Sequence, residues 1–358
     1  MKKILVGMSG GVDSSVAALL LKQQGYNVSG CTLKLFDGNI EDSADTETRT
    51  CCSLSDVEDA RSVCYRLGIE HYVFNFKDLF RTEVMDRFAD GYINGETPNP
   101  CIFCNRYIKF DKMLERALLL GFDGIATGHY AKTERDEKFG RTLLIRPADR
   151  RKDQTYVLYN MTQFQLERTV FPLWDRDKEQ NRILAEQHGL VNARKPDSQD
   201  ICFVPDGDYA KFILEHTKKD FPEGDFIDTD GNVIGRHSGI IRYTIGQRKG
   251  LGVTFGKPVY VCGKDTEKNT VTLGDSESLM TLTATAEDVN LISVSDISEP
   301  MRITAKTRYN MSDAAGTLER VGDSRIKVTF DVPQRAVTKG QALVVYDGDI
   351  VVGGGKII

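Results

Sequence analysis

The loop spanning residues 9–15, Ser-Gly-Gly-Val-Asp-Ser-Ser, constrains the fold more than any other part of the chain. It follows the apolar run Lys3–Met8 and opens a helical pattern at Val12–Gln24, so it joins a strand to a helix. Adjacent glycines let a backbone approach a ligand closely, and the first amides of a helix point outward. Together with the serine hydroxyls, they predict an anion site.

The loop matches neither of the two commonest nucleotide-binding patterns. It lacks the lysine of a Walker A loop, and its glycine spacing is not GxGxxG. A strand-to-helix turn with a helix cap would account for Gly-Gly alone, but not for the full string. We therefore expect a phosphate site of another kind.

Strand and helix patterns alternate through the first half of the chain. Strand-like runs at 28–36, 71–76 and 124–128 are separated by helical patterns at 53–67, 78–94 and 105–120. Repeated β-α-β units predict a parallel sheet with helices on both faces. The aperiodic acidic stretch 37–50 is expected to be a mobile loop, and residues 155–220 lean helical.

The character of the chain changes after Phe226. Short alternating segments separated by Gly, Asp and Asn predict an all-β region that ends in a small barrel. We expect an α/β catalytic domain at 1–205, a small central module at 206–277 and a C-terminal β-barrel at 278–358.

The cysteine content points to a reducing compartment. Eight cysteines in 358 residues are too few for a secreted disulfide scaffold. The N-terminal apolar run is too short for a signal peptide, and no run approaches the ~18 residues of a membrane span. We expect a cytoplasmic protein with reduced thiols and no membrane partner, in which cysteine clusters serve catalysis or metal binding.

Three cysteines form the candidate constellation. Cys101 and Cys104 make a C-x-x-C pair, and Cys202 lies far along the chain. If Asn105 caps the following helix, Cys104 lies at a helix N-terminus, where a thiol pKa is lowered. A zinc site would need a second C-x-x-C motif or a matched pair of histidines, and neither is present. A [4Fe-4S] cluster held by these three thiols remains an alternative. The remaining cysteines are read as buried hydrophobes (Cys31, Cys64, Cys262) or left unassigned (Cys51, Cys52).

The loop at 9–15 resembles the PP-loop of N-type ATP pyrophosphatases, which cleave ATP between its α and β phosphates. An ordered set of further strings is similar to the bacterial tRNA-specific 2-thiouridylase family over essentially the full chain: Gly7–Ser15, Thr97–Asn105, Ala126–Tyr130, Lys152–Tyr156, Lys195–Phe203, Tyr243–Gly252 and Gly353–Gly355. The PP-loop is shared by several families, but the ordered set is specific.

The resemblance implies that ATP, with Mg²⁺, adenylates the oxygen on C2 of the wobble uridine (U34) of tRNA, and that sulfur then replaces this oxygen at C2. Cys202 matches the cysteine that carries a persulfide, and Cys104 the nucleophile that completes transfer, often through a transient disulfide. The sulfur would come from a donor protein, either a cysteine desulfurase or a relay protein. The wobble base must leave the anticodon stack to react.

The same resemblance assigns binding residues by position. The matched ATP contacts are Gly7, Met8, Ser9, Gly10, Gly11, Val12, Asp13, Ser14, Leu33 and Gly128. The matched tRNA contacts are Asn99, Pro100, Cys101, His129, Lys152, Asp153, Gln154, Arg308, Tyr309 and Gln341.

Cys101 departs from the family pattern. Many members have Asp there, to which a general acid/base role is assigned. The cysteine leaves proton transfer unassigned and completes the possible cluster triplet of Cys101, Cys104 and Cys202. We expect the persulfide route without a cluster, and keep the cluster as the alternative.

The net charge of −5 argues globally against a nucleic-acid binder, but local basic stretches argue for one. Residues 231–264 hold six Lys or Arg and no acid, residues 300–342 hold eight against four acids, and residues 141–153 hold five against two. With Tyr243 and Tyr309 interleaved, they predict an RNA-facing side.

Two other classes of function remain. A PP-loop ligase acting on a small metabolite would need neither the cysteine pair nor a basic β module. A non-catalytic RNA-binding protein would need no intact PP-loop. Pyrophosphate release that depends on tRNA and a sulfur donor distinguishes the thiouridylase from both.

Overall fold

The protein is described by a computed structural model that covers residues 1–36, 54–196, 201–252, 256 and 258–358. The expected loop at 37–50, the first residue of the helix expected at 53–67 and the pair Cys51-Cys52 lie outside these residues.

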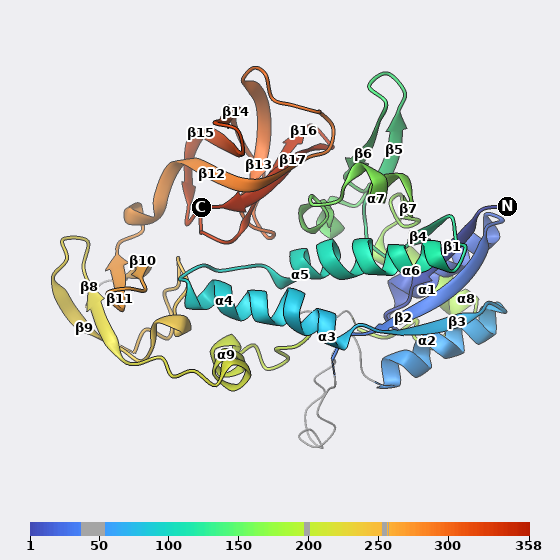
Figure 1. Ribbon diagram of the computed structural model, residues 1–358, viewed down its shortest axis with the longest axis horizontal. Helices are drawn as coiled ribbons and strands as arrows, with labels where there is room; N and C mark the ends of the chain where they lie inside the picture. The colour runs from blue at the N-terminus through green and yellow to red at the C-terminus, as the bar shows by residue number, and fades with distance from the viewer. Residues whose placement is uncertain (37–53, 197–200, 253–255, 257) are drawn as a thin grey trace.

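A five-stranded parallel sheet forms the first part of the molecule, as the sequence predicts (Figure 1). The strand order is β3-β2-β1-β4-β7, and every neighbouring pair is parallel. The strands are β1 (Lys3–Gly7), β2 (Asn27–Lys34), β3 (His71–Asn75), β4 (Gly124–Ala126) and β7 (Thr169–Val170).

The sheet is covered on both faces. Along β1, Ile4 and Val6 pack into one core with the helices α1, α2 and α8, whereas Leu5 packs into the opposite core with Phe110 and Met113. The near-continuous burial of β1 follows from this sandwich. The first face carries α1 (Val12–Gln23), α2 (Leu54–Leu67) and α8 (Lys178–Gln187). The second carries two long helices, α3-η1-α4 (Lys77–Phe80, Arg81–Asp86, Arg87–Ile93) and α5-η2-α6 (Pro100–Phe103, Cys104–Lys112, Met113–Leu119).

The helical expectation for residues 155–220 is only partly right. The stretch contains α7 (Gln163–Glu167), α8 and α9 (Tyr209–Thr217), but strand β7 and irregular turns separate them. In the described ranges, no helix combines the length and the apolar character that crossing a bilayer requires.

A second, four-stranded sheet follows the α/β part. Its order is β10-β11-β8-β9, and the strands are β8 (Gly224–Ile227), β9 (Val233–His237), β10 (Tyr260–Asp265) and β11 (Thr270–Gly274). Buried Phe226 packs edge-on against His237 and Tyr243, which gives this small sheet an aromatic centre.

The C-terminal part is a closed β-barrel, which confirms the predicted fold class. Six strands run in the order β12-β15-β14-β13-β16-β17, and pairing of β12 with β17 closes the ring. They are β12 (Met280–Leu291), β13 (Met301–Lys306), β14 (Ala314–Val321), β15 (Arg325–Arg335), β16 (Ala342–Asp347) and β17 (Ile350–Ile357). At Gly354, a Cβ atom would lie 2.5 Å from the Leu343 carbonyl oxygen and 2.7 Å from the ring of Tyr159, so the close packing here requires glycine.

A hairpin from the α/β part extends the barrel sheet. Its strands are β5 (Lys132–Asp136) and β6 (Arg141–Ile145), and Ile145 pairs with Ile350 of β17 (Figure 1). The Arg141 guanidinium also donates to the carbonyl oxygens of Leu291 and Ile292, at 3.0 and 2.7 Å. The barrel is therefore fixed to the α/β part by backbone and side-chain hydrogen bonds.

Candidate active site

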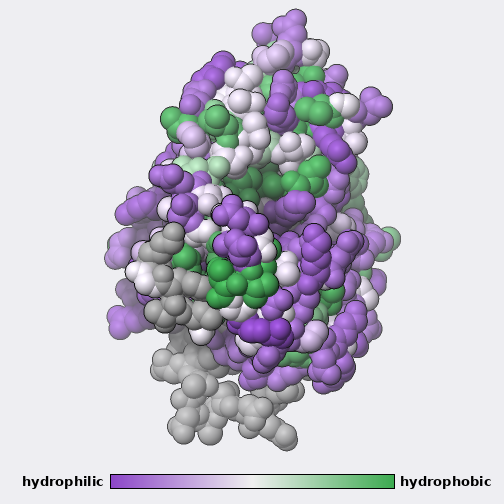
Figure 2. All heavy atoms as spheres, turned by 90° about the vertical axis from the view of Figure 1, so that its left-hand side faces the viewer, coloured by the Kyte–Doolittle hydropathy of each residue, from purple (hydrophilic) through white to green (hydrophobic). Residues whose placement is uncertain are grey.

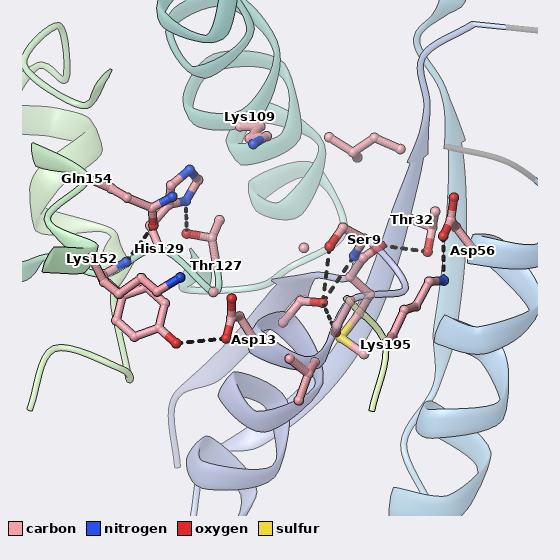
Figure 3. Close-up of a pocket in the computed structure, with 18 of the residues that line it drawn as sticks. Ser9, Asp13, Thr32, Asp56, Lys109, Thr127, His129, Lys152, Gln154 and Lys195 are labelled. Carbon is pink, nitrogen blue, oxygen red and sulfur yellow. Dashed lines mark hydrogen bonds and ion pairs between the residues drawn. The ribbon is translucent and has the colours of Figure 1, made fainter. Parts of the chain in front are cut away.

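A pocket of about 430 Å³ opens at the carboxyl ends of the parallel strands (Figure 3). Three segments that follow strands meet there: the loop after β1, Leu33 and Leu35 at the end of β2, and Thr127–Tyr130 after β4. The sequence predicts this meeting place, because ligands of open α/β sheets bind beyond the strand carboxyl ends. Of the residues expected to contact ATP, these line the pocket: Gly7, Met8, Ser9, Gly11, Val12, Asp13, Ser14, Leu33 and Gly128.

Gly10 supports the loop from behind instead of lining the pocket. Its φ is +73°, and a Cβ atom there would lie 2.6 Å from the Asp56 carbonyl oxygen. Asn192 donates hydrogen bonds to the Gly10 carbonyl, at 2.9 Å, and to the Ser15 hydroxyl, at 2.8 Å. These contacts fix the loop against α2 and the segment after α8.

The loop serines hold the turn and do not cap the helix. The Ser14 hydroxyl accepts a hydrogen bond from the Ser9 amide at 3.2 Å and donates to the Gly11 carbonyl at 3.0 Å. Gly11, the N-cap of α1, makes no side-chain capping hydrogen bond. The first amides of α1 thus face the pocket without a side-chain cap, as an anion site requires.

Gly128 lets the two loops touch. A Cβ atom at this position would lie 2.7 Å from both the Asp13 carbonyl carbon and the Ser14 nitrogen. Any side chain here would push the glycine-rich loop away from β4. The pocket floor therefore depends on glycine at both loops.

Tyr130 ties the pocket walls together. Its hydroxyl donates to the Asp13 carboxylate at 2.8 Å and accepts from the Asn181 amide at 2.9 Å. Its backbone nitrogen donates to the Gln154 side chain at 2.8 Å. The second carboxylate oxygen of Asp13 lies 2.8 Å from Lys178 Nζ.

The pocket has a positive balance of charge. Lys109, Lys152, Lys178 and Lys195 line it, against the carboxylates of Asp13 and Asp56. Lys195 lies 2.7 Å from Asp56 and 2.6 Å from Asp59. Burial alone would lower the pKa of Lys195, but hydrogen bonds to these two carboxylates raise it above its ordinary value. An anionic ligand with several phosphates suits this lining.

His129 is buried in the pocket wall and packs against the rings of Phe110 and Phe171, which also contact each other. Its Nδ1 shares a hydrogen bond with the Thr127 hydroxyl at 2.6 Å. Burial, together with the charge of Lys109, holds the pKa of His129 well below its ordinary value. A neutral imidazole therefore lies at the pocket edge at physiological pH.

The helix that carries the C-x-x-C motif begins earlier than predicted. Pro100 is its first residue, and the Asn99 side chain caps it by accepting a hydrogen bond from the Cys101 amide at 3.0 Å. Asn105 is not a cap, since its side chain donates to the Val157 carbonyl at 3.0 Å. Cys101, not Cys104, thus occupies the first turn. An Asn cap followed by proline was the sequence signal for this start.

Cys104 and Cys202 both contact one extended hydrophobic cluster, which runs from β1 to the barrel strands β16 and β17. Cys104 is buried, and Cys202 is half-buried and packs against the same core cluster. Phe203, next to Cys202, contacts the rings of Phe80 and Phe88 edge-on. Cys31, Cys64 and Cys262 are buried or half-buried, in line with their reading as hydrophobes.

Where the chain is described, no group of three or more Cys, His, Asp or Glu side chains could hold a metal ion. Cys101, Cys104 and Cys202 are all described, and they do not form such a group. The structure thus offers no ligand set for the iron–sulfur alternative.

The residues expected to contact tRNA fall into two groups. Lys152, Gln154, His129 and Tyr309 line the pocket, and Tyr309 comes from the barrel. The others make contacts within the fold: Asn99 and Pro100 start the helix, Asp153 accepts hydrogen bonds from Thr155, Arg308 donates to the Arg335 and Ala336 carbonyls, and Gln341 donates to the Thr97 carbonyl at 2.6 Å. Their contacts with RNA stay predictions.

The basic stretch at 231–264 is smaller than its sequence indicates. Lys264 is not at the surface: its Nζ is buried without a hydrogen-bond partner, 5.6 Å from the centre of the Tyr92 ring. Burial lowers the pKa of Lys264 to about 8. Arg236 pairs with Asp225, and Lys257 lies outside the described residues. The face seen from the side of β8–β11 carries mainly hydrophilic residues, with apolar ones in a hollow (Figure 2).

Sequence reasoning missed Thr32, Asp56, Lys109 and Lys178, which all line the pocket. Lys178 lies in the first turn of α8, away from every motif, and Lys109 lies within η2, about one turn beyond the C-x-x-C motif. No local signal marks them, since only the tertiary fold brings them to the loop.

Three family models match consecutive parts of the chain. They are described as the tRNA methyl transferase HUP domain (residues 2–206), the tRNA methyl transferase PRC-barrel domain (210–275) and the aminomethyltransferase beta-barrel domain (282–357).

Curated relatives match over nearly the whole chain. The tRNA-specific 2-thiouridylase MnmA of Clostridioides difficile is 54% identical, covering 99% of this chain and 98% of its own. The protein of the same name from Acetivibrio thermocellus is 53% identical, covering 99% of both. Solved structures match weakly. An NMN synthetase from Francisella tularensis has a TM-score of 0.35 at 16% identity, over 62% of this chain and 79% of that one, and such a likeness says nothing about the site.

Proposed function

Because this chain belongs to the tRNA-specific 2-thiouridylase family, we propose that it is an ATP-dependent tRNA-uridine 2-sulfurtransferase. It adenylates the C2 oxygen of the wobble uridine, U34, and replaces that oxygen with sulfur from a cysteine persulfide. The observation that carries the proposal is the lysine-lined pocket at the PP-loop, walled by Tyr309 of the barrel. A PP-loop ligase that acts on a small metabolite would require neither Tyr309 of the barrel nor the cysteines.

The phosphates of ATP lie against the first amides of α1 and the surrounding lysines. The close approach at Gly128 and the missing side-chain cap at Gly11 support this placement. Mg²⁺ would neutralise phosphate charge, and Asp13 and Asp56, which pair with Lys178 and Lys195, are the carboxylates of the pocket lining that would hold it. Adenylation makes the C2 oxygen a good leaving group.

The target base lies on the barrel side of the pocket. Tyr309 offers an aromatic face on which an extruded base can stack. Burial, together with the charges of Asp153 and Cys101, raises the pKa of Tyr309, so the phenol stays protonated. The electrostatic influence of Cys101 on Tyr309 supports a base site beside the C-x-x-C motif.

Cys202 carries the sulfur as a persulfide, and Cys104 completes its release to the base. A donor protein, either a cysteine desulfurase or a relay protein, loads Cys202. We favour the route without an iron–sulfur cluster, because the described thiols form no metal-holding group. Iron analysis of anaerobically purified protein tests this choice, and stoichiometric iron required for activity would overturn it.

The central experiment measures pyrophosphate release and 2-thiouridine formation with tRNA, ATP and a persulfide donor. Release should depend on both tRNA and the donor. Cys104→Ser and Cys202→Ser should abolish thiolation and keep ATP binding, whereas Cys262→Ser, a half-buried thiol in β10, should behave as wild type. Release without tRNA, or full thiolation by either of the first two variants, contradicts the proposal.

A further inference from the structure

We propose that Cys101 is a resolving thiol, which frees Cys202 after each sulfur transfer by thiol–disulfide exchange at Cys104. The inference rests on the proposed function, because it starts from a disulfide between Cys104 and Cys202. It gives a chemical role to the cysteine that stands where many members of the family have Asp.

The helix brings the Cα atoms of the two C-x-x-C cysteines within the range that a disulfide spans. The Cys104 amide donates to the carbonyls of Pro100 and Cys101, so the turn between the cysteines is helical. At 1.5 Å rise and 100° per residue, positions three apart have Cα atoms about 5 Å apart on one helix face. Disulfides span Cα distances of roughly 4.4–6.8 Å, so this pair can close without unwinding the helix.

The two thiols differ in exposure. Cys101 is exposed in the first turn, held there by the Asn99 cap, whereas Cys104 is buried one turn further on. Cys104 also lies in the core cluster against which Cys202 packs. Cys104 is thus the least accessible of the three thiols, Cys202 is half-buried and Cys101 is the most exposed. An external reductant reaches a disulfide most easily at Cys101.

The step balances as follows. Sulfur transfer leaves a bond between the Sγ atoms of Cys104 and Cys202. The Cys101 thiolate attacks Sγ of Cys104, the new Cys101–Cys104 bond forms, and the old bond breaks. Cys202 leaves as a thiolate and takes up the proton that Cys101 gave up. Cys202 can then accept the next sulfur, and an external dithiol supplies two electrons to reduce the exposed Cys101–Cys104 disulfide.

The test follows disulfides through one turnover. Full-length protein with a persulfide on Cys202 reacts with ATP and a tRNA transcript without reductant, and non-reducing peptide mapping locates the bonds. Wild type should yield a Cys101–Cys104 disulfide and an alkylatable Cys202. Cys101→Ser should yield a Cys104–Cys202 disulfide instead, and Cys262→Ser should match wild type.

Multiple turnover gives a second readout. With a protein dithiol as reductant, Cys101→Ser should complete one turnover and then slow by about tenfold or more, because the buried disulfide is poorly accessible. A small dithiol in excess should restore it. A persistent Cys104–Cys202 disulfide in wild type, or sustained turnover by Cys101→Ser, overturns the inference. Failure of wild type to thiolate at all would instead overturn the proposed function.

Discussion

The hydroxyl of Tyr130 donates a hydrogen bond to the carboxylate of Asp13, 2.8 Å away, and joins the segment after β4 to the first turn of α1. The same hydroxyl accepts from Asn181 of α8. Two faces of the ATP pocket are therefore held by one buried phenol.

Tyr130→Phe should weaken both the fold and ATP binding. The change leaves the buried Asn181 amide without its acceptor, which costs about 1–3 kcal/mol of unfolding free energy. Asp13 keeps Lys178 but loses its second donor, so ATP affinity should fall several-fold. Chemical denaturation and calorimetric titration with ATP measure the two effects. Tyr65→Phe, at an 89% exposed position, is the control and should change neither.

Gly128→Ala should displace the glycine-rich loop. The added methyl group would lie 2.7 Å from the backbone of Asp13 and Ser14, and neither backbone atom can move without shifting α1. We expect a loss of about 1–3 kcal/mol in stability, as for overpacking, together with a marked loss of ATP affinity.

Gly11→Ala is the matched control for stability. Its φ is −90°, and the new methyl group would meet only the Ser9 hydroxyl, at 3.5 Å. Equal destabilisation by both substitutions would show that close packing at Gly128 is not the cause.

Lys264→Met should stabilise the protein. The wild-type amine is buried without a hydrogen-bond partner, and burial lowers its pKa from 10.5 to about 8. Between about pH 8 and pH 10.5 the Lys264 amine is protonated in the unfolded state and neutral in the folded state. The free energy of unfolding of the wild type should therefore rise over this pH range, by on the order of 3 kcal/mol from this group.

Unfolding free energies at pH 7 and pH 10 test this expectation. The difference in unfolding free energy between pH 7 and pH 10 should be smaller in Lys264→Met than in wild type. The stability gained by the substitution should be largest at pH 7. Lys219→Met, at an exposed position, should follow wild type. A destabilised Lys264→Met at pH 7 would argue that the ammonium makes a net favourable contact with Tyr92.

His129 should make the protein sensitive to acid. Its pKa is well below the ordinary 6.5 in the folded state, because burial and Lys109 disfavour the imidazolium. The unfolded state therefore gains a proton that the folded state does not, and stability falls as pH drops below about 6.5. His129→Gln should show a weaker loss between pH 7 and pH 5 in thermal unfolding, whereas His188→Gln at the end of α8 should not.

The sequence predicts those parts of the fold that local patterns encode. The run Lys3–Met8 and the glycine-rich loop place β1, α1 and the turn that lines the pocket correctly, because strand period, glycine and helix start are neighbours in the chain. The predicted start of the cysteine helix was wrong, because Asn99, and not Asn105, caps the helix and Pro100 begins it. Contacts between distant segments were out of reach: nothing near Lys178 indicates Asp13, and nothing near Ile145 indicates Ile350.

The pairing of β6 with β17 affects how this chain can be recombined. The Thr97 amide also donates a hydrogen bond to the Lys339 carbonyl, at 2.9 Å. These two contacts join the last third of the protein to the first third. A barrel taken from a distant relative would lack the hairpin that matches it, and its residue at position 309 would face an unmatched pocket. Chimeras that exchange the barrel alone should therefore be inactive. Chimeras that also exchange residues 96–97 and 132–145 from the same relative should be active.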